Sequence, residues 1–332
     1  MTTPPAPTYC ITLDGEDITP RFNPRLQQLT LTDNRDGEAD QLDINLTDHD
    51  GALAIPRKGV RLTLALGFKD GALVDKGAFI VDEVEHSGPP DVLTIRARSA
   101  ELTQQFRRRR DESWHGKTLG NIIETIASRN NLKPSIDAEL AAQAVNHIDQ
   151  TGESDIAFVM RLGRRFDAVA TVKNGTLLFL KISNTVTSQG NSLPMLTIAR
   201  NETQNHRYNA ADRDSYTGVR AFYDDKNTAS RHSVTEGSDE NPKELATLYA
   251  DAKEAQDAAQ SEYKQMERQT AMLSLTLATG RPDLMTQTPV TVQGFKDEIN
   301  AITWLAVKVS HSLSADSGLI TSVDLEKIGD GK

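Results

Sequence analysis

The tetrapeptide Gly67-Phe68-Lys69-Asp70 recurs in the chain as Gly294-Phe295-Lys296-Asp297. Each copy closes a segment in which apolar and polar residues alternate. A second pair of similar segments follows in the same order, Val84-Glu85-His86-Ser87 and Val309-Ser310-His311-Ser312, and each precedes a Gly-containing turn and another strand-like segment. Ordered self-similarity at a distance indicates a repeated architecture. We therefore predict two copies of one small β-barrel, separated by helical segments.

Alternation with period two is typical of strands buried on one face, and it surrounds the first copy of the repeat. Residues 42–46 and 60–68 alternate apolar and polar side chains. The dipeptides Asp36-Gly37, Asp50-Gly51 and Asp70-Gly71 follow such segments, and Asp-Gly favours a turn because Gly accepts a positive φ. The N-terminal part is therefore predicted to be antiparallel β-sheet.

The period changes after Ser99 and predicts helices in the middle of the chain. Thr118 can cap a helix whose apolar residues recur at i, i+3, i+4 and i+7. A second helix is predicted over 154–166 for the same reason. Strands return at 168–172 and 177–182, with the hairpin signal Asn174-Gly175 between them. The middle of the chain is therefore predicted to be α plus β.

The last third contains two polar segments, 184–194 and 224–241, which have the Gly, Ser and Asn content of surface loops. Asn241-Pro242-Lys243-Glu244 has the cap, the N1 proline and the N3 acid of a helix start, which predicts a long helix over 241–270. Alternation returns beyond this helix. It predicts that Val307 is a buried strand residue.

These changes of period define the predicted fold class. It is α+β, mainly β, with two related small antiparallel β-barrels and intervening α/β segments. The predicted divisions are 1–100 for the first barrel, 101–190 for a helical and α/β insert, 191–240 for strands and a loop joining the second barrel, 241–270 for the long helix and 271–332 for the rest of the second barrel.

Composition excludes several classes of protein. The 332 residues are 37% hydrophobic and 25% charged, which is typical of a soluble globular chain of about two domains. No apolar run reaches the roughly 18 to 20 residues of a membrane-spanning helix. The net charge of −10 opposes dedicated nucleic-acid binding. The single cysteine, Cys10, allows no internal disulfide, and the N-terminus lacks the pattern of a secretion signal.

Two segments partly match ligand-binding motifs. Gly116-Lys117-Thr118 resembles the end of a phosphate loop, but Asp111 stands where that pattern requires Gly. Residues 32–43 partly match a calcium loop, but the twelfth position is Asp43, inside a predicted strand. A helix cap and a hairpin turn account better for the two segments.

We predict no catalytic, cofactor-binding or metal-binding residues. None of the histidines is spaced as ligands of one metal ion, so each is expected to lie singly on a strand or loop. They are His49, His86, His115, His147, His206, His232 and His311. The basic run from Arg107 to Arg110 could contact phosphates, but a solvated or ion-pairing role is favoured because Asp111 and Glu112 follow it at once.

These ordered features resemble the late control protein D family of contractile-tailed phages, over roughly Tyr9 to Ile328. The most specific segment is Gln150-Thr151-Gly152-Glu153-Ser154-Asp155 followed by Phe158-Val159-Met160-Arg161-Leu162, and it is also similar to the N-terminal part of the valine-glycine repeat spike proteins of type VI secretion. The other matching segments are Pro56-Arg57-Lys58-Gly59, Ser113 to Leu119 and Trp304 to His311.

The resemblance implies a structural baseplate hub. Three chains would form a ring whose two barrels per chain match a hexameric tail tube on one side and a trimeric spike on the other, around a central channel through which phage DNA may pass. The family's spike-bearing relatives continue into a long needle, so this chain would bind a separate spike protein. The implied partners are further copies of the chain, the spike, the tube and baseplate proteins, with no cofactor. The implied location is the virion tail, after assembly in the bacterial cytoplasm.

The sequence is also compatible with two other functions. Some related hub assemblies carry lytic domains, so a tail-associated peptidoglycan hydrolase is the second hypothesis, although no span of the chain is left for such a domain. A DNA-binding regulator of late genes is the third hypothesis. The sequence shows no helix-turn-helix with a basic recognition face, which disfavours it.

Overall fold

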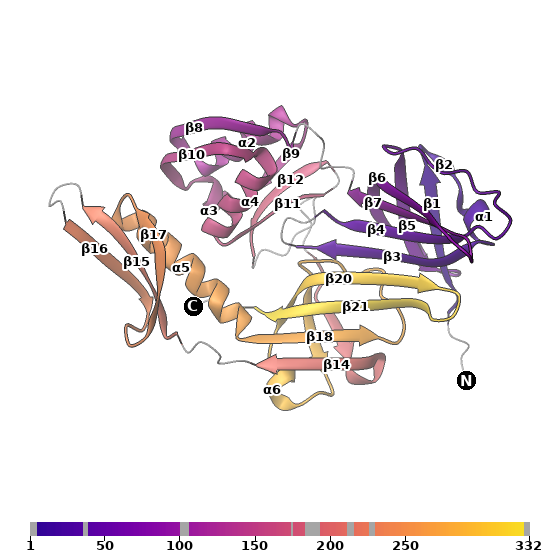
Figure 1. The fold of residues 1–332 in the computed structure, drawn as a ribbon. Coiled ribbons are helices and arrows are strands. Elements are labelled where there is room, and N and C mark those ends of the chain that lie inside the picture. Colours follow the sequence, from indigo (N-terminus) through magenta and orange to yellow (C-terminus); the bar gives the residue numbers. More distant parts are fainter. Residues whose placement is uncertain are drawn as a thin grey trace.

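A computed structural model describes residues 5–35, 39–99, 106–173, 175–182, 193–210, 216–225 and 230–328. Strands dominate, and a 13-stranded sheet runs through both ends of the chain in the order β14-β18-β21-β20-β3-β4-β7-β6-β5-β1-β2, with β19 and β13 joined to β20. The fold class predicted from the sequence, α+β and mainly β, is confirmed. Figure 1 shows β14, β18, β21, β20 and β3 side by side in this order.

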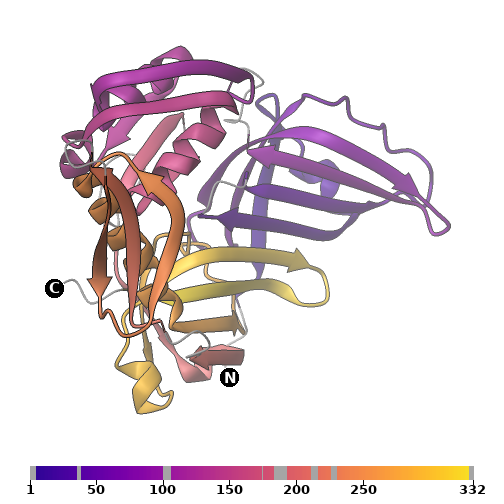
Figure 2. The same ribbon diagram turned by 60° about the vertical axis from the view of Figure 1, so that its left-hand side comes forward.

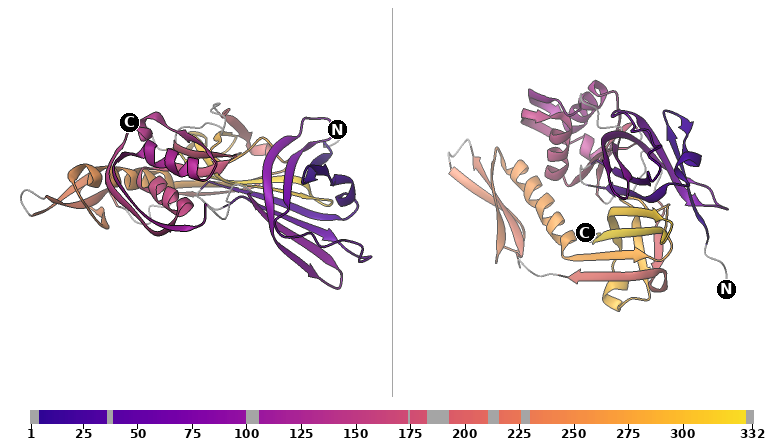
Figure 3. Two further views of the ribbon diagram at one scale, coloured as in Figure 1. Left: turned by 90° about the horizontal axis from the view of Figure 1, so that it is seen from above. Right: turned by 45° about the vertical axis from the view of Figure 1, so that its right-hand side comes forward.

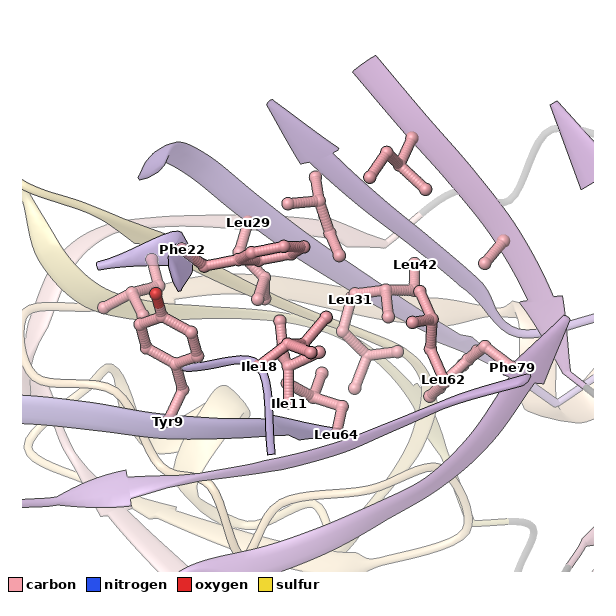
Figure 4. Close-up of a cluster of buried hydrophobic side chains, with 14 of the residues drawn as sticks. Tyr9, Ile11, Ile18, Phe22, Leu29, Leu31, Leu42, Leu62, Leu64 and Phe79 are labelled. Atoms are coloured by element: carbon pink, nitrogen blue, oxygen red, sulfur yellow. The ribbon is translucent and has the colours of Figure 1, made fainter. Parts of the chain in front are cut away.

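The first unit, residues 7–99, is an antiparallel sheet wrapped around its own core. Its elements are β1 (Pro7–Leu13), β2 (Glu16–Asp17), α1 (Thr19–Phe22), β3 (Leu26–Asn34), β4 (Gln41–Thr47), β5 (Arg61–Phe68), β6 (Val74–Ser87) and β7 (Val92–Ser99). Alternate residues of each strand enter the core shown in Figure 4, where Ile11, Leu42 and Leu64 are almost fully buried. The turn predicted at Asp36-Gly37 lies outside the described residues.

The second unit, residues 196–210 and 271–327, has a separate core around Trp304. Its elements are β13 (Leu196–Ala199), η1 (Arg200–Glu202), β14 (Thr203–Ala210), β18 (Ala271–Leu277), β19 (Pro289–Gln293), α6 (Asp297–Asn300), β20 (Trp304–Ser314) and β21 (Gly318–Lys327). Buried residues alternate along β18 and β21 as period two requires. Each unit therefore buries one face of its strands.

The prediction of two closed barrels was wrong. In the described part of the first unit, β3 does not pair with β1 to close the sheet. The second edge of β3 instead pairs with β20, so the two units share one open, continuous sheet. An edge strand exposes unpaired backbone groups, and pairing with the other unit satisfies those groups as well as closure would.

The insert, residues 106–182, has its own core. Its elements are β8 (Arg109–Thr118), α2 (Leu119–Arg129), β9 (Lys133–Ile136), α3 (Ala138–Ala141), β10 (Ala144–Ser154), α4 (Asp155–Arg165), β11 (Ala168–Lys173) and β12 (Thr176–Lys181). Both predicted helices are confirmed, because Thr118 and Ser154 cap α2 and α4 by accepting hydrogen bonds from backbone amides of the first turn. Figure 2 shows the insert above the second unit.

The arm, residues 218–269, packs three strands against one helix. They are β15 (Gly218–Asp225), β16 (Ser230–Gly237), β17 (Pro242–Tyr249) and α5 (Ala252–Gln269). The arm and the first unit lie at opposite ends of the molecule (Figure 3). In the described residues, the second polar segment is not a loop throughout, because β16 pairs with β15 inside it. Most of the other polar segment, 184–194, lies outside the described residues.

The predicted start of the long helix was also wrong. Pro242–Tyr249 is a strand that pairs in parallel with β15, and the helix begins only at Ala252. Asp251 is its cap, since the carboxylate accepts a hydrogen bond from the amide of Glu254. The sheet satisfies the backbone of 242–249 and buries part of Leu245, and this tertiary gain outweighs the local helix-start signal.

Candidate functional site

The two units arrange six strands in the same order. The order is β3-β4-β7-β6-β5-β1 in the first unit and β14-β18-β21-β20-β19-β13 in the second. Strands at the same place in the two orders therefore correspond. They differ in the last pair, because β1 runs antiparallel to β5 whereas β13 runs parallel to β19. The repeat predicted from the sequence is thus a repeat of sheet topology.

The correspondence extends to the register of individual residues. Val84 faces Ile95 across β6 and β7, and Val309 faces Val323 across β20 and β21. Two bulges also occupy matching places, between Val81 and Glu83 as between Ala306 and Lys308, and between Leu26 and Gln28 as between Thr203 and Asn205. A bulge shifts the alternation of every later residue, so shared bulges are a strict test of equivalence.

Only one of the two sequence matches that suggested the repeat places its residues at equivalent positions of the two sheets. His86 and His311 occupy the same register position of corresponding strands. The tetrapeptides do not, because Gly67 and Phe68 lie within β5 whereas Gly294 and Phe295 follow β19. The second tetrapeptide leads into α6, which replaces the hairpin turn of the first unit. The tetrapeptide therefore marks corresponding strands without forming the same turn.

The units meet where β3 pairs with the second half of β20, over Gln28–Asn34 and Lys308–Ser314. The face of the shared sheet that points away from both cores is polar. Cross-strand hydrogen bonds connect Thr94 to Asn45, Ser274 to Asp324 and Thr276 to Ser322 on this face. Its charged residues include Asp43, Asp82, Glu83, Glu85 and Asp324, which are acidic, and Arg96, Arg98, Arg207 and Lys308, which are basic. This mainly polar face extends over both units and also carries the exposed Met272.

Several strand edges of the shared sheet have no partner among the described residues, among them the outer edges of β13 and β2, and two further ones correspond to the strands of the joint between the units. β14 pairs only with β18, and the second half of β6, from Asp82 to Ser87, pairs only with β7. The corresponding stretches in the joint between the units are β3 and the second half of β20, which pair with each other. The chain therefore presents two free edges of the same two kinds that already join inside it.

A largely buried ionic cluster, whose side chains are 14–25% exposed, connects three parts of the molecule. Lys173 of the insert donates to Asp40 and, at 2.8 Å, to Asp33 of the first unit. Asp33 also accepts hydrogen bonds from the amide and hydroxyl of Thr286, at 2.9 and 3.0 Å. Burial raises the pKa of Asp40 to about 6, against the attraction of Lys173. Burial also acts to lower the pKa of Lys173, but the charges of Asp33 and Asp40 outweigh it and raise that pKa.

His311 lies beside this cluster and is only 1% exposed. Its Nδ1 is 2.9 Å from the hydroxyl of Thr321, and its Nε2 is 3.1 Å from both the carbonyl oxygen of Leu284 and Nζ of Lys76. Burial, followed by the charge of Lys76, lowers the pKa of His311 to about 3. Burial likewise lowers the pKa of Lys76 to about 8. The imidazole is therefore neutral over the whole ordinary pH range.

His311 should make the protein lose stability in mild acid. Because its pKa is lower in the folded chain than in the unfolded chain, the unfolded state binds more protons between about pH 6.5 and pH 3, and stability falls as the pH falls. Between pH 6.5 and pH 5 the expected loss is about 2 kcal/mol. Urea titrations at both pH values should show that the wild type loses about 2 kcal/mol more stability over this interval than His311→Asn does.

The raised pKa of Asp40 acts with the opposite sign, since its folded form binds more protons between about pH 4 and pH 6. The informative quantity is therefore the difference between the wild type and His311→Asn at each pH. His49→Asn, which changes an exposed histidine, is the matched control and should follow the wild type. Equal losses in wild type and His311→Asn would contradict a neutral, buried imidazole.

The most specific segment of the family resemblance has a structural role in the insert. Asp155 is fully buried and accepts hydrogen bonds from the side-chain amides of Asn130 and Gln150, at 2.9 and 3.0 Å. Arg110 and Arg129 lie 3.4 and 3.5 Å from its carboxylate oxygens. A buried carboxylate needs such partners, and here they tie α2, α4, β8 and β10 together. The segment stabilises the insert from inside.

The basic run from Arg107 to Arg110 is thus partly explained. Arg110 forms an ion pair with Asp155 within the chain, in agreement with the ion-pairing role that the sequence favoured. Arg107 and Arg108 are exposed. Gly116-Lys117-Thr118 ends β8, and Thr118 is a helix cap, as predicted. The segment 32–43 spans parts of β3 and β4, and no helix flanks it in the described residues.

The histidines do not all lie singly. His115 and His147 face each other across β8 and β10, with Nδ1 atoms 3.0 Å apart, and Nε2 of His147 is 3.2 Å from Asp149. Sequence spacing could not find this pair, because it depends on strand register.

Over the described ranges, no group of three or more His, Cys, Asp or Glu side chains is placed to hold a metal ion. Within the same ranges no helix is long and apolar enough to span a membrane.

Comparison with known proteins agrees with the resemblance. The family model described as phage tail baseplate hub (GPD) matches residues 41–317. The probable baseplate hub protein of Escherichia phage 186 is 41% identical over 362 residues, which cover 97% of this chain and 93% of that protein. The resemblance to the phage late control protein D family is therefore confirmed.

Two solved structures share the fold. The 43 kDa tail protein of prophage MuSo2 from Shewanella oneidensis has a TM-score of 0.72 at 15% identity, covering 97% of this chain and 99% of that chain. An E. coli type VI secretion component has a TM-score of 0.57 at 14% identity, covering 96% of this chain and 76% of that chain. With the family match and the close relative, this chain belongs to the phage tail baseplate hub (GPD) family and is a component of a phage tail baseplate.

Proposed function

We propose that three copies of this chain form a ring that joins a hexameric tail tube to a trimeric spike. The observation that carries this proposal is the repeat of six strands in matching order and register. One chain offers two equivalent units, so three chains offer six similar positions to a sixfold tube while keeping threefold symmetry for a spike. A head-to-tail contact between copies can generate such a closed ring.

The polar face of the shared sheet is proposed to line the central channel of this ring. Hydroxyl and amide side chains cover it, and its acidic and basic residues are close to balance. A wall of this kind has few fixed charges to retain a phosphate backbone that passes through. The net charge of −10 therefore lies mostly on other surfaces.

The role is proposed to be mechanical, with assembly in the host cytoplasm. Asp155, the acid at the centre of the most specific matching segment, is buried among cations and amides inside the insert, which supports a structural use rather than acid catalysis. We also propose that residues 1–100 form a first barrel-like unit and residues 101–190 an insert. Separate hydrophobic cores in these two regions support it.

Mass measurement in solution tests the ring. The purified chain should associate from 36.4 kDa toward three times that mass as its concentration rises, and the spike protein of the same phage should stabilise the trimer. A chain that stays monomeric at all concentrations, with and without that spike, would contradict the proposal. In the same preparation, clearing of a peptidoglycan gel would favour the hydrolase instead.

A further inference from the structure

We propose that His115 and His147 form a binding site for one divalent transition-metal ion of the class of Zn²⁺, Ni²⁺ and Cu²⁺, on the exposed face of the insert. The two Nδ1 atoms bind the ion, and water fills its remaining coordination positions. Both ligands belong to the same part of one chain, so the site does not depend on the proposed ring.

Strand register brings the two histidines together. His115 in β8 faces His147 in β10, and their rings stack with centroids 4.4 Å apart. Figure 1 shows the two strands side by side. The neighbouring pair, Trp114 and Ile148, also faces across these strands, but both of its side chains are buried in the core of the insert. This buried pair fixes the strands and so holds the backbone under the histidines in place.

The separation of the ligand atoms suits a single metal ion. The Nδ1 atoms of His115 and His147 are 3.0 Å apart. Metal–imidazole bonds are about 2.0–2.1 Å long, so two nitrogens on one ion lie about 2.8–3.4 Å apart when the angle at the metal is about 90–109°. The two nitrogens therefore already have the spacing of neighbouring ligands. Turning the exposed rings about their Cβ–Cγ bonds directs both lone pairs at the ion.

Asp149 sets the tautomer that metal binding requires. Its Oδ2 is 3.2 Å from Nε2 of His147, and its Oδ1 accepts a 2.5 Å hydrogen bond from the hydroxyl of Ser113. Because a carboxylate can only accept, Nε2 of the neutral His147 carries the proton and its Nδ1 keeps a lone pair. Histidines that bind metals usually donate their other ring N–H to a carboxylate in this way. Asp149 thus prepares His147 to act as a ligand.

The same tautomer explains what the pair does without metal. The Nδ1–H of His115 then donates to the lone pair of His147, which accounts for the contact at 3.0 Å. When an ion binds both Nδ1 atoms, the proton of His115 moves through solvent to Nε2 of the same ring. The two rings are therefore a hydrogen-bonded pair without metal and a chelating pair with it.

Exposure and ligand chemistry define the ion that the site accepts. The side chain of His147 is 52% exposed, and His115 is exposed as well, so an ion reaches the pair from solvent. Imidazole suits Zn²⁺, Ni²⁺ and Cu²⁺, whereas Mg²⁺ and Ca²⁺ require oxygen ligands. Two protein ligands, in place of the four of a closed structural site, leave positions for water. The bound ion should tie β8 to β10 and exchange with solvent.

Equilibrium dialysis against Zn²⁺ and against Cu²⁺ tests the site, with metal analysis of the full-length chain prepared without an affinity tag. The wild type should bind one ion per chain, and excess Mg²⁺ should not displace it. Asp149→Ala keeps both ligands and should weaken binding about tenfold, because a partner that orients a ligand is lost. His115→Asn and His147→Asn should weaken binding further. His49→Asn, which removes another exposed histidine, is the matched control and should bind like the wild type.

Pulsed electron paramagnetic resonance of the Cu²⁺ complex identifies the ligands directly, because each bound imidazole gives a signal from its remote ring nitrogen. The spectrum should count two imidazoles in the wild type and one in His115→Asn or His147→Asn. This count in the wild type stays decisive even if a variant folds poorly. Copper that carries at most one imidazole in the folded wild type would overturn the proposal.

Stability measurements complete the test. Without metal, the histidine variants should keep the urea midpoint of the wild type, because both positions are exposed. Added Zn²⁺ should raise the midpoint of the wild type but not that of His147→Asn, since a ligand of the folded state stabilises it. Equal zinc binding by these two chains would mean adventitious ions at other groups. Equal binding, or no binding of Zn²⁺ and Cu²⁺ to the folded wild type, would leave a hydrogen-bonded histidine pair only and overturn the site.

Discussion

Leu64→Asp is expected to unfold the first unit. Leu64 lies in β5, is 1% exposed and faces the core of that unit. Its burial contributes about 1.5–3 kcal/mol, and an unpaired carboxylate in its place adds a desolvation cost of several kcal/mol more. The sum is comparable to the whole stability of about 5–15 kcal/mol that ordinary domains have.

Hydrogen exchange followed by mass spectrometry measures this effect unit by unit. Protection should be lost over β3 to β7 in Leu64→Asp, while the fluorescence of Trp114 and Trp304 reports on the insert and the second unit. Gln28→Asp, which places the same charge at an exposed position of β3, should keep protection within about 0.5 kcal/mol of the wild type. Normal protection in Leu64→Asp would contradict the placement of β5 in the core.

Local sequence patterns predicted those elements in which a single feature, such as alternation of apolar residues or a helix cap, determines the local structure. The alternation at 60–68 and the cap at Thr118 were both confirmed. The alternation through Val307 misled, because the bulge between Ala306 and Lys308 shifts the pleat, so that Val307 is only half-buried while Val309 is fully buried. A bulge cannot be recognised from the alternation of apolar and polar residues. Locating it requires knowledge of the pairing with the neighbouring strand.

The features that matter for assembly depend on residues far apart in the sequence. The repeat was visible because two short segments are alike, but the shared sheet was not, since its joint pairs β3 with a strand nearly three hundred residues later. The free edges follow from the same pairing. The pair of His115 and His147 likewise depends on strand register alone. Periodicity describes which face of a strand is buried, and it carries no information about which strand lies beside it.

Lys173→Met should destabilise the connection between the insert and the two units by about 3 kcal/mol, since it leaves the largely buried carboxylates of Asp33 and Asp40 without their cation. The matched control is Lys181→Met, because Lys181 also ends a strand of the same hairpin and pairs with an acid, Glu139, which is 78% exposed. Solvent screens such a pair, and its loss should change stability by less than about 1 kcal/mol. Urea denaturation with Trp114 fluorescence measures both variants.

The penalty should arise from the uncompensated acids rather than from the lost lysine contacts, and combined substitution separates the two causes. In the triple variant Lys173→Met, Asp33→Asn, Asp40→Asn no charge of the cluster stays buried, while the amide oxygen introduced at position 33 can still accept a hydrogen bond from Thr286. Stability should therefore return to within about 1–2 kcal/mol of the wild type, as happens when whole buried ion pairs are replaced by neutral groups. A triple variant as unstable as Lys173→Met alone would instead mean that the lysine acts by packing, and the cluster would not be the ionic link between the three parts.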